Sequence, residues 1–308
     1  MKLSVSSSPH LRAAVTTERI MRDVLIALIP CIIAGVCLYG LRTLLVVGVC
    51  TLLCIFLEFT CRFVMKREQT VFDLSAAVTG VLLGLSLPVS IPIPLTFVGC
   101  FTAIVVVKQM FGGLGNNFVN PALTGRIVML VSFPTQLSSF TTPTWVDAVT
   151  TATPLAPTGA STPLLDLFLG RVGGCIGESC KLAILLGLVY LLVRRVISPI
   201  IPLCYLGTVA LFSLLVGESV LFQLLSGGLL FGAVFMATDY VTSPVGKWAQ
   251  VVYAVGCGLL TVLIRLYAAL PEGVSYAIVL MNIASPLIER IPFGKTFGKR
   301  KAKEGQGR

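Results

Sequence analysis

Residues 24–41 read VLIALIPCIIAGVCLYGL, an uncharged apolar stretch as long as the helix that crosses the hydrocarbon core of a membrane. After Arg42, residues 43–61 read TLLVVGVCTLLCIFLEFTC, in which Glu58 is the only charged residue. Helices at the surface of soluble proteins keep a polar face toward water, and neither stretch has one. These residues therefore predict an all-α integral membrane protein.

The composition of the whole chain agrees with this fold class. Of its 308 residues, 56% are hydrophobic and 12% are charged, and the mean hydropathy is +0.96. Soluble domains average roughly 45–50% apolar and about 25% charged residues. The excess is spread along the chain, which excludes a soluble enzyme with one membrane anchor. The single histidine also excludes any site built from several histidines.

Ten apolar windows predict about ten transmembrane helices. The windows are 24–41, 43–61, 74–88, 94–110, 122–134, 181–198, 200–216, 221–237, 250–267 and 274–288. Windows 74–88 and 122–134 are short and adjoin clusters of Gly, Pro and Asn. Short, interrupted segments of this kind are typical of broken helices that line a cavity.

The positive charges predict the orientation. With both termini in the cytoplasm, only Arg42, Arg171, Lys181 and Arg265 of the 23 Lys and Arg residues fall on the outer side. This distribution follows the positive-inside rule, so the basic tail is expected to anchor the topology beside anionic lipid. Nucleic acid is not an expected partner, although the net charge is +10.

The chain also repeats itself loosely. Leu74-Ser75-Ala76-Ala77 matches Leu225-Ser226-Gly227-Gly228, and each begins an apolar stretch. Five windows per half would make the halves run in opposite directions, as in inverted-repeat transport folds. Packing of small residues would produce a similar pattern and stays the alternative. The predicted division is 1–23 cytoplasmic segment, 24–134 first repeat, 135–180 outer loop, 181–288 second repeat and 289–308 basic cytoplasmic tail.

The cysteines give little indication of a metal site. Most lie in apolar windows, where Cys packs as a small hydrophobe, and no Cys-x-x-Cys pair occurs. Cys50 and Cys54 share a helix face, and packing is the favoured interpretation. Cys175 and Cys180 lie in the outer loop and could form a disulfide; the sequence leaves both options open.

Glycines and asparagines crowd the segment Gly112-Gly113-Leu114-Gly115-Asn116-Asn117. It lacks the third glycine of a dinucleotide loop and has no βαβ unit around it, so a tight loop is expected. Asn120-Pro121 should begin the next helix, with Asn as its cap and Pro in its first turn. A ligand site and a structural cap are equally compatible with these residues.

Most ionisable residues sit near the ends of the windows, where they are expected to pair or to reach the interface. Asp239 is the best functional candidate, because residues 238–244 (TDYVTSP) form a dense polar cluster at the end of a window. Such a cluster, with Asp239 and Thr242, could coordinate a cation or close a gate. The outer loop contains Asp147-Ala148-Val149-Thr150-Thr151-Ala152-Thr153-Pro154, which without further context is a solvated, turn-prone segment.

Taken together, these motifs resemble the D subunit of the Rnf-type ion-translocating electron transport complex, and the homologous B subunit of the sodium-translocating NADH:quinone oxidoreductase. Six ordered blocks carry the resemblance: Ser8-Pro9-His10; Asp73-Leu74-Ser75-Ala76 with Thr79-Gly80 and Leu87-Pro88; Lys108-Gln109 through Gly112–Asn116 to Asn120-Pro121-Ala122; Leu225-Ser226-Gly227-Gly228; Thr238-Asp239 with Val241-Thr242; and Asn282 with Pro286-Leu287.

The resemblance implies a flavoprotein. In that family the outer loop carries FMN joined through its phosphate to a threonine, in a motif like Asp-x-x-Ser-(Gly/x)-Ala-Thr. Thr153 matches the attachment residue. Asp147, Thr150, Thr151, Ala152 and Pro154 form the surrounding motif that a flavin transferase reads, and Thr150 and Thr151 depart from the commoner Ser-Gly.

Further implications of the resemblance are a urea-transporter-like inverted-repeat fold and a second flavin, riboflavin or FMN, bound noncovalently. Asn116, Asn120 and Arg126 are the candidate ligands for that flavin, because they are polar groups at the ends of broken helices. Asp239 and Thr242 are the candidates for an ion path. Neither a catalytic residue nor a metal site is expected in this chain.

The implied function is that of a membrane subunit which carries electrons through FMN, while its complex couples ferredoxin/NAD electron transfer to translocation of Na⁺ or H⁺. Its partners would be the other subunits, and its location the bacterial cytoplasmic membrane, with Thr153 on the outer side. The alternative is a passive channel or secondary carrier for a small solute, in which the outer loop is only a lid.

Overall fold

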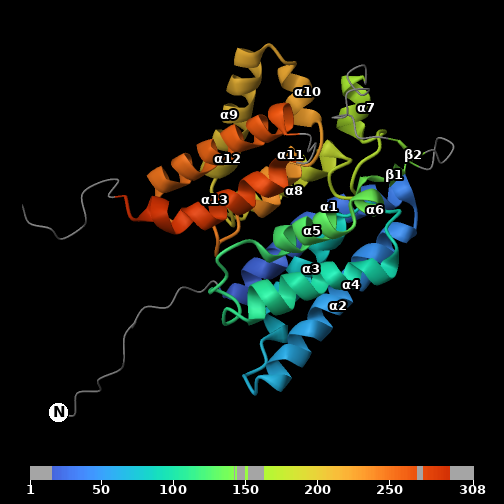
Figure 1. Cartoon of the computed structure of the whole chain (residues 1–308), viewed down its shortest axis with the longest axis vertical. Helices are drawn as coiled ribbons and strands as arrows, with labels where there is room; N and C mark the ends of the chain where they lie inside the picture. The colour runs from blue at the N-terminus through green and yellow to red at the C-terminus, as the bar shows by residue number, and fades with distance from the viewer. Residues whose placement is uncertain (1–15, 142, 144–149, 152–162, 269–272, 292–308) are drawn as a thin grey trace, which may run out of the picture.

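A computed structural model describes residues 16–141, 143, 150–151, 163–268 and 273–291, and these residues are mostly helical (Figure 1). The helices are α1 (Thr17–Tyr39), α2 (Arg42–Val64), η1 (Val71–Asp73), α3 (Ser75–Leu85), α4 (Ile93–Phe101), η2 (Thr102–Gln109), α5 (Pro121–Ser132), α6 (Pro134–Ser138), α7 (Leu164–Leu169), α8 (Lys181–Val193), α9 (Ile200–Val216), α10 (Val220–Leu225), α11 (Leu229–Phe231), η3 (Gly232–Met236), α12 (Lys247–Tyr267) and α13 (Gly273–Glu289). Strands β1 (Phe140–Thr141) and β2 (Thr150–Thr151) pair antiparallel.

The helical fold class is confirmed, and every apolar window lies on helix. Within the described residues, three helices are long and apolar enough to cross a membrane by themselves, namely α1, α2 and α12. The helices of the other windows are shorter, and one of these windows is interrupted. The window 221–237, expected to be continuous, divides into α10 and the run α11–η3 at Ser226, whose backbone is extended. The prediction of ten crossings stays a prediction.

The two halves of the chain form two groups of helices (Figure 1). Helices α1–α5, coloured blue to green, lie together, and α8–α13, coloured yellow to red, form the other group. The groups meet where α1 packs on α8 and where α5 packs on α13. In the first group α2 packs on α4 and η2, and in the second group α9 packs on α12.

Helix α3 lies inside the first group, and every one of its residues is buried. Its small residues allow this position, because the backbone of α2 passes directly over them. A Cβ added at Gly80 would lie 2.5 Å from the Cα of Thr51, and one at Gly84 would lie 2.9 Å from the Cα of Val47. The small residues of this window therefore serve close helix packing.

A turn at residues 173–179 enters the molecule and caps the carboxyl end of α3. The amide of Ile176 donates to the carbonyl oxygen of Leu87 at 3.1 Å, and the amide of Gly177 donates to that of Leu85 at 2.7 Å. A helix that ends inside the protein leaves carbonyl groups without partners, and these amides satisfy two of them. This part of the segment expected to be an outer loop is therefore buried.

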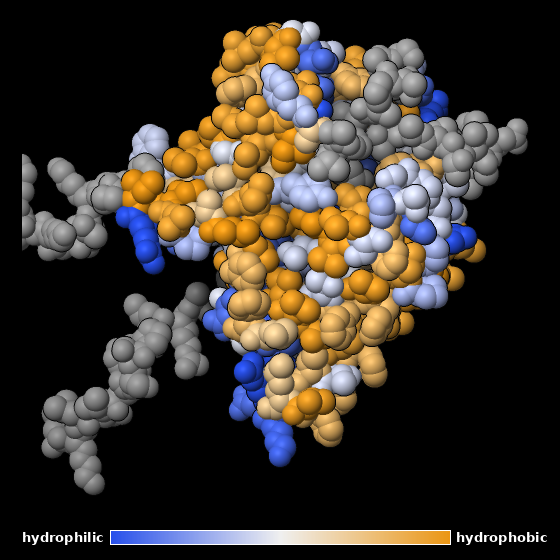
Figure 2. Space-filling model, viewed as in Figure 1, coloured by the Kyte–Doolittle hydropathy of each residue, from blue (hydrophilic) through white to orange (hydrophobic). Residues whose placement is uncertain are grey.

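Hydrophobic side chains cover much of the outer surface of both groups (Figure 2). On α9, for example, Leu203, Leu214 and Leu215 are each more than 65% exposed. Water would not tolerate apolar faces of this extent on a monomer, whereas lipid does. The apolar helices and their exposed apolar side chains are those of a multi-pass membrane protein.

Candidate functional site

Two cavities lie back to back around the first turn of α5 and the helix η3. Leu123 and Met236 line one cavity, and the neighbouring Ala122 and Phe235 line the other. The cavities enclose about 680 and 740 Å³ of space, open mouths included.

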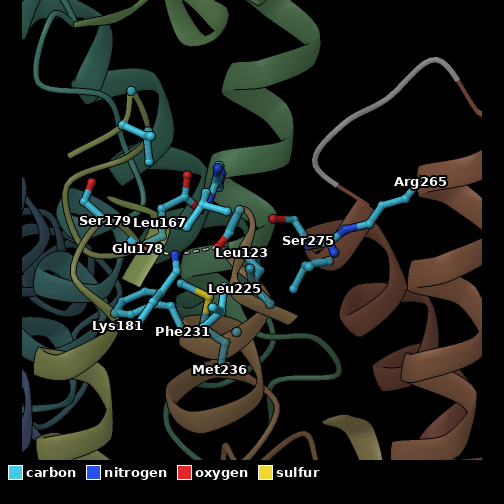
Figure 3. Close-up of a pocket in the computed structure, with 18 residues that line it drawn as sticks. Leu123, Leu167, Glu178, Ser179, Lys181, Leu225, Phe231, Met236, Arg265 and Ser275 are labelled. Atoms are coloured by element: carbon cyan, nitrogen blue, oxygen red, sulfur yellow. Dashed lines mark hydrogen bonds between the residues drawn. The ribbon is translucent and has the colours of Figure 1, made fainter. Parts of the chain in front are cut away.

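The first cavity, named the Lys181 cavity, is lined by the buried Lys181 and the half-buried Arg265 (Figure 3). Lys181 begins α8 and is 3% exposed, and its Nζ donates to the backbone oxygens of Glu178 and, at 3.1 Å, Gly227. Arg265 comes from the last turn of α12. In Figure 3 Glu178, Ser179 and Lys181 lie on one side of the cavity and Arg265 and Ser275 on the other.

Arg265 holds the broken end of α10. Its Nη1 donates to the backbone oxygen of Gln223 at 2.8 Å and to its Oε1 at 3.1 Å, and its Nη2 donates to the backbone oxygen of Ser226 at 3.1 Å. Its Nε is buried without a hydrogen-bond partner in the described part of the chain. Arg265 therefore has a spare donor beside the cavity.

Glu178 is the carboxylate of the Lys181 cavity. Its Oε1 accepts from the backbone amide of Cys175 at 2.9 Å, and its Oε2 fills the space that a Cβ at Gly228 would need. All acceptors that Lys181 and Arg265 reach among the described residues are amide oxygens. Neither cation forms a direct ion pair with a carboxylate there, and the cavity is electropositive because Arg126, Lys181 and Arg265 outnumber the one carboxylate, Glu178.

Arg126 adds a third cationic side chain to the Lys181 cavity. It lies on α5, is 5% exposed, and places Nη2 3.2 Å from Sγ of Cys175. Cys175 and Cys180 do not form a disulfide in the structure. The Cys175 thiol is turned toward the guanidinium of Arg126, not toward Cys180.

The second cavity, named the Asp239 cavity, contains a cation that is neutralised. Lys108, at the end of η2, is 1% exposed and donates from Nζ to Oε2 of Glu58 at 2.7 Å and to Oγ of Ser75 at 2.6 Å. Glu58 is fully buried and also accepts from Nε2 of Gln109 at 3.0 Å. The expectation that these ionisable groups pair is met, and the pair is buried inside the protein.

The glycine-rich loop presents a different asparagine to this cavity than expected. Gly112, Gly113 and Gly115 have positive φ, and the turn they make leaves Asn116 exposed. Asn117 is 7% exposed and lines the Asp239 cavity, and its Oδ1 is buried without a hydrogen-bond partner in the described chain. An unpaired buried acceptor of this kind is a natural partner for a ligand N–H group.

Asn120 is the N-cap of α5, as predicted, and Pro121 is its first residue. Its Oδ1 accepts from the amides of Ala122 and Leu123 at 3.0 and 3.2 Å. Its Nδ2 donates at 3.2 Å to the backbone oxygen of Met236, the last residue of η3. The side chain of Asn120 therefore joins the two halves of the chain while it borders the Asp239 cavity.

Asp239 and Thr242 lie together in the turn between η3 and α12. Asp239 lines the second cavity and is half-buried, and its Oδ2 accepts from Oγ1 of Thr242 at 3.0 Å. Burial raises the pKa of the Asp239 carboxyl above its ordinary value, and the bond from Thr242 opposes part of this rise. Thr242 itself is 4% exposed and does not border either cavity.

The flavin motif falls mostly outside the described residues, which exclude Asp147, Ala152, Thr153 and Pro154. Thr150 and Thr151 form β2, whose backbone pairs with β1 so that Thr151 lies opposite Phe140 and Thr150 opposite Thr141. After the gap, the chain is described again just before α7, and Leu167 of α7 lines the Lys181 cavity.

Sequence reasoning missed four residues of these cavities: Asn117, Glu178, Lys181 and Arg265. The charge distribution places Lys181 and Arg265 on the outer side of the membrane and gives them no further role. Two signals were present: the Ser226-Gly227-Gly228 break in an apolar window, and a lone carboxylate inside the glycine-rich segment 173–180 (GGCIGESC). Both mark irregular backbone at membrane depth, which proteins place around cavities.

Comparison with known proteins supports one family for this chain. Residues 4–298 match the model of the NQR2, RnfD, RnfE family. A relative in Acetobacterium woodii, the D subunit of its Na(+)-translocating ferredoxin:NAD(+) oxidoreductase complex, is 47% identical over 99% of this chain and 98% of its own length. The D subunit of the proton-translocating ferredoxin:NAD(+) oxidoreductase complex of Clostridium ljungdahlii is 37% identical over 97% of both chains.

A third relative, the D subunit of the ion-translocating oxidoreductase complex of Pseudomonas paraeruginosa, is 35% identical over 99% of this chain and 98% of its own length. These similarities confirm the resemblance seen in the sequence motifs. The chain belongs to the NQR2, RnfD, RnfE family, as a protein of the RnfD type.

Proposed function

We propose that this chain is the membrane subunit of an Rnf-type complex and carries electrons through FMN esterified to Thr153. The complex would couple electron transfer between ferredoxin and NAD to translocation of Na⁺ or H⁺. The observation that carries this proposal is the nearly full-length similarity to subunits named for that reaction. The named ion differs between those two relatives, so the proposal covers both.

The contacts between helices support an inverted repeat of five segments. Helix α1 would correspond to α8, α2 to α9, α3 to the run α11–η3, α4–η2 to α12, and α5 to α13. The packing of α2 on α4–η2 then matches that of α9 on α12, and the packing of α4–η2 on α5 matches that of α12 on α13. In this arrangement the chain crosses the cytoplasmic membrane ten times, with both termini inside and Thr153 outside.

The Lys181 cavity is the proposed site of the FMN ring system attached at Thr153, because its wall combines cationic side chains with glycines at 227 and 228, beside which a flat ring can pack. In the sequence, Thr153 lies between β2 and α7. Leu167 of α7 lines this cavity. The flavin, when bound, supplies a carrier that exchanges electrons one at a time.

In this proposal the residues of the cavity orient the ring and exclude water. Lys181 and Arg265 would face its electron-rich edge, and Arg126 would lie on the side of α5. Phe231 and Met236 supply apolar wall. The phosphoester to Thr153 would keep the cofactor from dissociating while the protein keeps the ring in one position.

The Asp239 cavity fits the second, noncovalent flavin. Asn117 offers the unpaired Oδ1 as an acceptor, and Asn120 borders the same space. Apolar side chains from both halves of the chain, among them Val78 and Phe235, complete the wall. The two flavins would then lie on opposite sides of the partition formed by η3 and the first turn of α5.

The test is to produce the complex together with a flavin transferase, denature it and look for flavin fluorescence on the band of this chain. Mass spectrometry of the peptide around residue 153 should find the mass added by FMN. Thr153→Ala should abolish both signals, and the control Thr135→Ala, at an exposed threonine outside the motif, should retain fluorescence.

A dark wild-type band in the presence of an active transferase would refute covalent FMN and favour the channel or carrier. Labelling of a cysteine placed at position 153 by an impermeant reagent tests the topology separately. Labelling only from the cytoplasm would contradict the proposed orientation.

A further inference from the structure

The two cavities differ in charge. In the Asp239 cavity, Lys108 is neutralised by Glu58 at 2.7 Å, and Asp239 adds a further carboxyl group. In the Lys181 cavity, Lys181 and Arg265 bind only amide oxygens among the described residues. A group that becomes negative is therefore stabilised in the Lys181 cavity more than in the Asp239 cavity.

Donors are also available in the Lys181 cavity. The Nε of Arg265 is buried and unpaired in the described chain, and Lys181 uses two acceptors where an ammonium group offers three donors. Buried donors without partners are costly, and a ligand that accepts from them removes that cost. The unpaired donor of Arg265 and the excess of cationic side chains over the single carboxylate of Glu178 thus favour the same kind of ligand, an electron-rich one.

Reduction of a flavin creates such a ligand. When the ring accepts one electron and no proton, it gains one negative charge, much of it on the N1–C2=O edge, and the donor group elsewhere in the complex loses that electron. Positive charge near this edge favours the reduced form and raises the potential. At low dielectric and short range, a single charge has a large effect.

We propose that Lys181 and Arg265 hold the N1–C2=O edge of the flavin in the Lys181 cavity and raise its one-electron potential. This inference rests on the proposed function, since it takes FMN on Thr153 as the occupant. It makes the covalent flavin the stronger electron acceptor of the two in this chain.

A structural role for the same residues predicts a different result. If Lys181 and Arg265 only satisfy the carbonyl groups at the breaks of α8, α10 and α11, glutamine at either position would still donate to those oxygens. Lys181→Gln and Arg265→Gln therefore remove the charge and keep a donor. Lys181→Arg and Arg265→Lys keep the charge.

The experiment is a spectroelectrochemical titration of the purified whole complex. The signal of the covalent flavin is the difference between the wild-type complex and Thr153→Ala. Each glutamine variant should lower the one-electron potential of the covalent flavin by at least about 59 mV, which corresponds to a tenfold change in the ratio of reduced to oxidised flavin. The charge-keeping variants should retain most of the wild-type potential.

Arg194→Gln is the matched control, because Arg194 pairs with Asp23 at 3.2 Å and lines neither cavity. An unchanged potential in both glutamine variants, with flavin still attached, would overturn the proposal and leave the proposed function standing. Absence of covalent flavin from the wild type would instead refute the proposed function.

A measurement on the wild-type complex decides the matter if the glutamine variants do not assemble. The one-electron potential of the covalent flavin should be higher than that of free FMN in the same buffer. A potential at or below that of free FMN contradicts the assignment.

Discussion

Replacing Glu58 by glutamine should destabilise the protein strongly, because it removes the charge that neutralises Lys108. Glu58 is fully buried and Lys108 is 1% exposed, and their charged atoms are 2.7 Å apart. Arg62, whose Nε is 3.8 Å from the same carboxylate, loses its partner as well. The variant keeps the shape of the side chain and leaves two cationic groups without an anion.

The magnitude follows from the distance and the burial. Two unit charges 2.7 Å apart attract by about 6 kcal/mol at an effective dielectric constant of ~20. After desolvation, removal of one partner of a buried pair costs about 3–5 kcal/mol. At roughly 2 °C per kcal/mol, this lowers the melting temperature by at least about 6 °C.

Thermal unfolding of the purified complex in detergent, followed by size-exclusion chromatography of this chain, measures the loss. Asp166→Asn is the control, because Asp166 and Arg171 form an exposed pair 3.9 Å apart, which should contribute less than ~1 kcal/mol. The double variant Glu58→Leu with Lys108→Leu should recover the part of the loss that comes from the lone charge of Lys108, while Arg62 still lacks its carboxylate partner. If Glu58→Gln were no more harmful than Asp166→Asn, the neutral charge assigned to the Asp239 cavity would be wrong.

Three further predictions concern packing, capping and protonation. Gly80→Val should prevent α3 from packing under α2 and sharply lower the yield of folded protein, whereas Gly48→Ala, which meets no atom within 4 Å, should leave the yield unchanged in the same expression assay. Asn120→Ala should cost about 1–2 kcal/mol in thermal unfolding through loss of the α5 cap, and Asn120→Asp, which keeps the capping oxygen, should cost less; equal losses would contradict the capping role. The pKa of Asp239 is raised in the folded state above its ordinary 3.8, so the folded state binds the proton more tightly and stability falls as pH rises from that value through the folded pKa. Asp239→Asn should remove this part of the pH dependence, and an unchanged stability profile across pH would refute the assignment.

Much of the fold could be predicted because lipid imposes a simple rule on sequence. A spanning segment must be apolar and helical, so the windows coincide with helices, and at α9 the window 200–216 and the helix have the same bounds. The cap at Asn120 was also predictable, since Asn followed by Pro starts a helix by purely local chemistry.

The parts that could not be predicted depend on contacts between distant segments. The break at Ser226 is stabilised by Arg265, far along the chain, and hydropathy carries no information about such a partner. Asn117 replaces Asn116 at the Asp239 cavity because three left-handed glycines turn the loop, and a shift of one residue is not visible in composition. The flavin motif itself stays a prediction from resemblance.

The turn at residues 173–179 has a consequence for synthesis in the membrane. Its amides complete the hydrogen bonding of α3, yet the ribosome makes them about 90 residues later. Until then the end of α3 keeps bare carbonyl oxygens, and lipid cannot hydrate them. The end of α3 therefore reaches its final hydrogen bonding only after residues 176 and 177 have joined the first half of the chain.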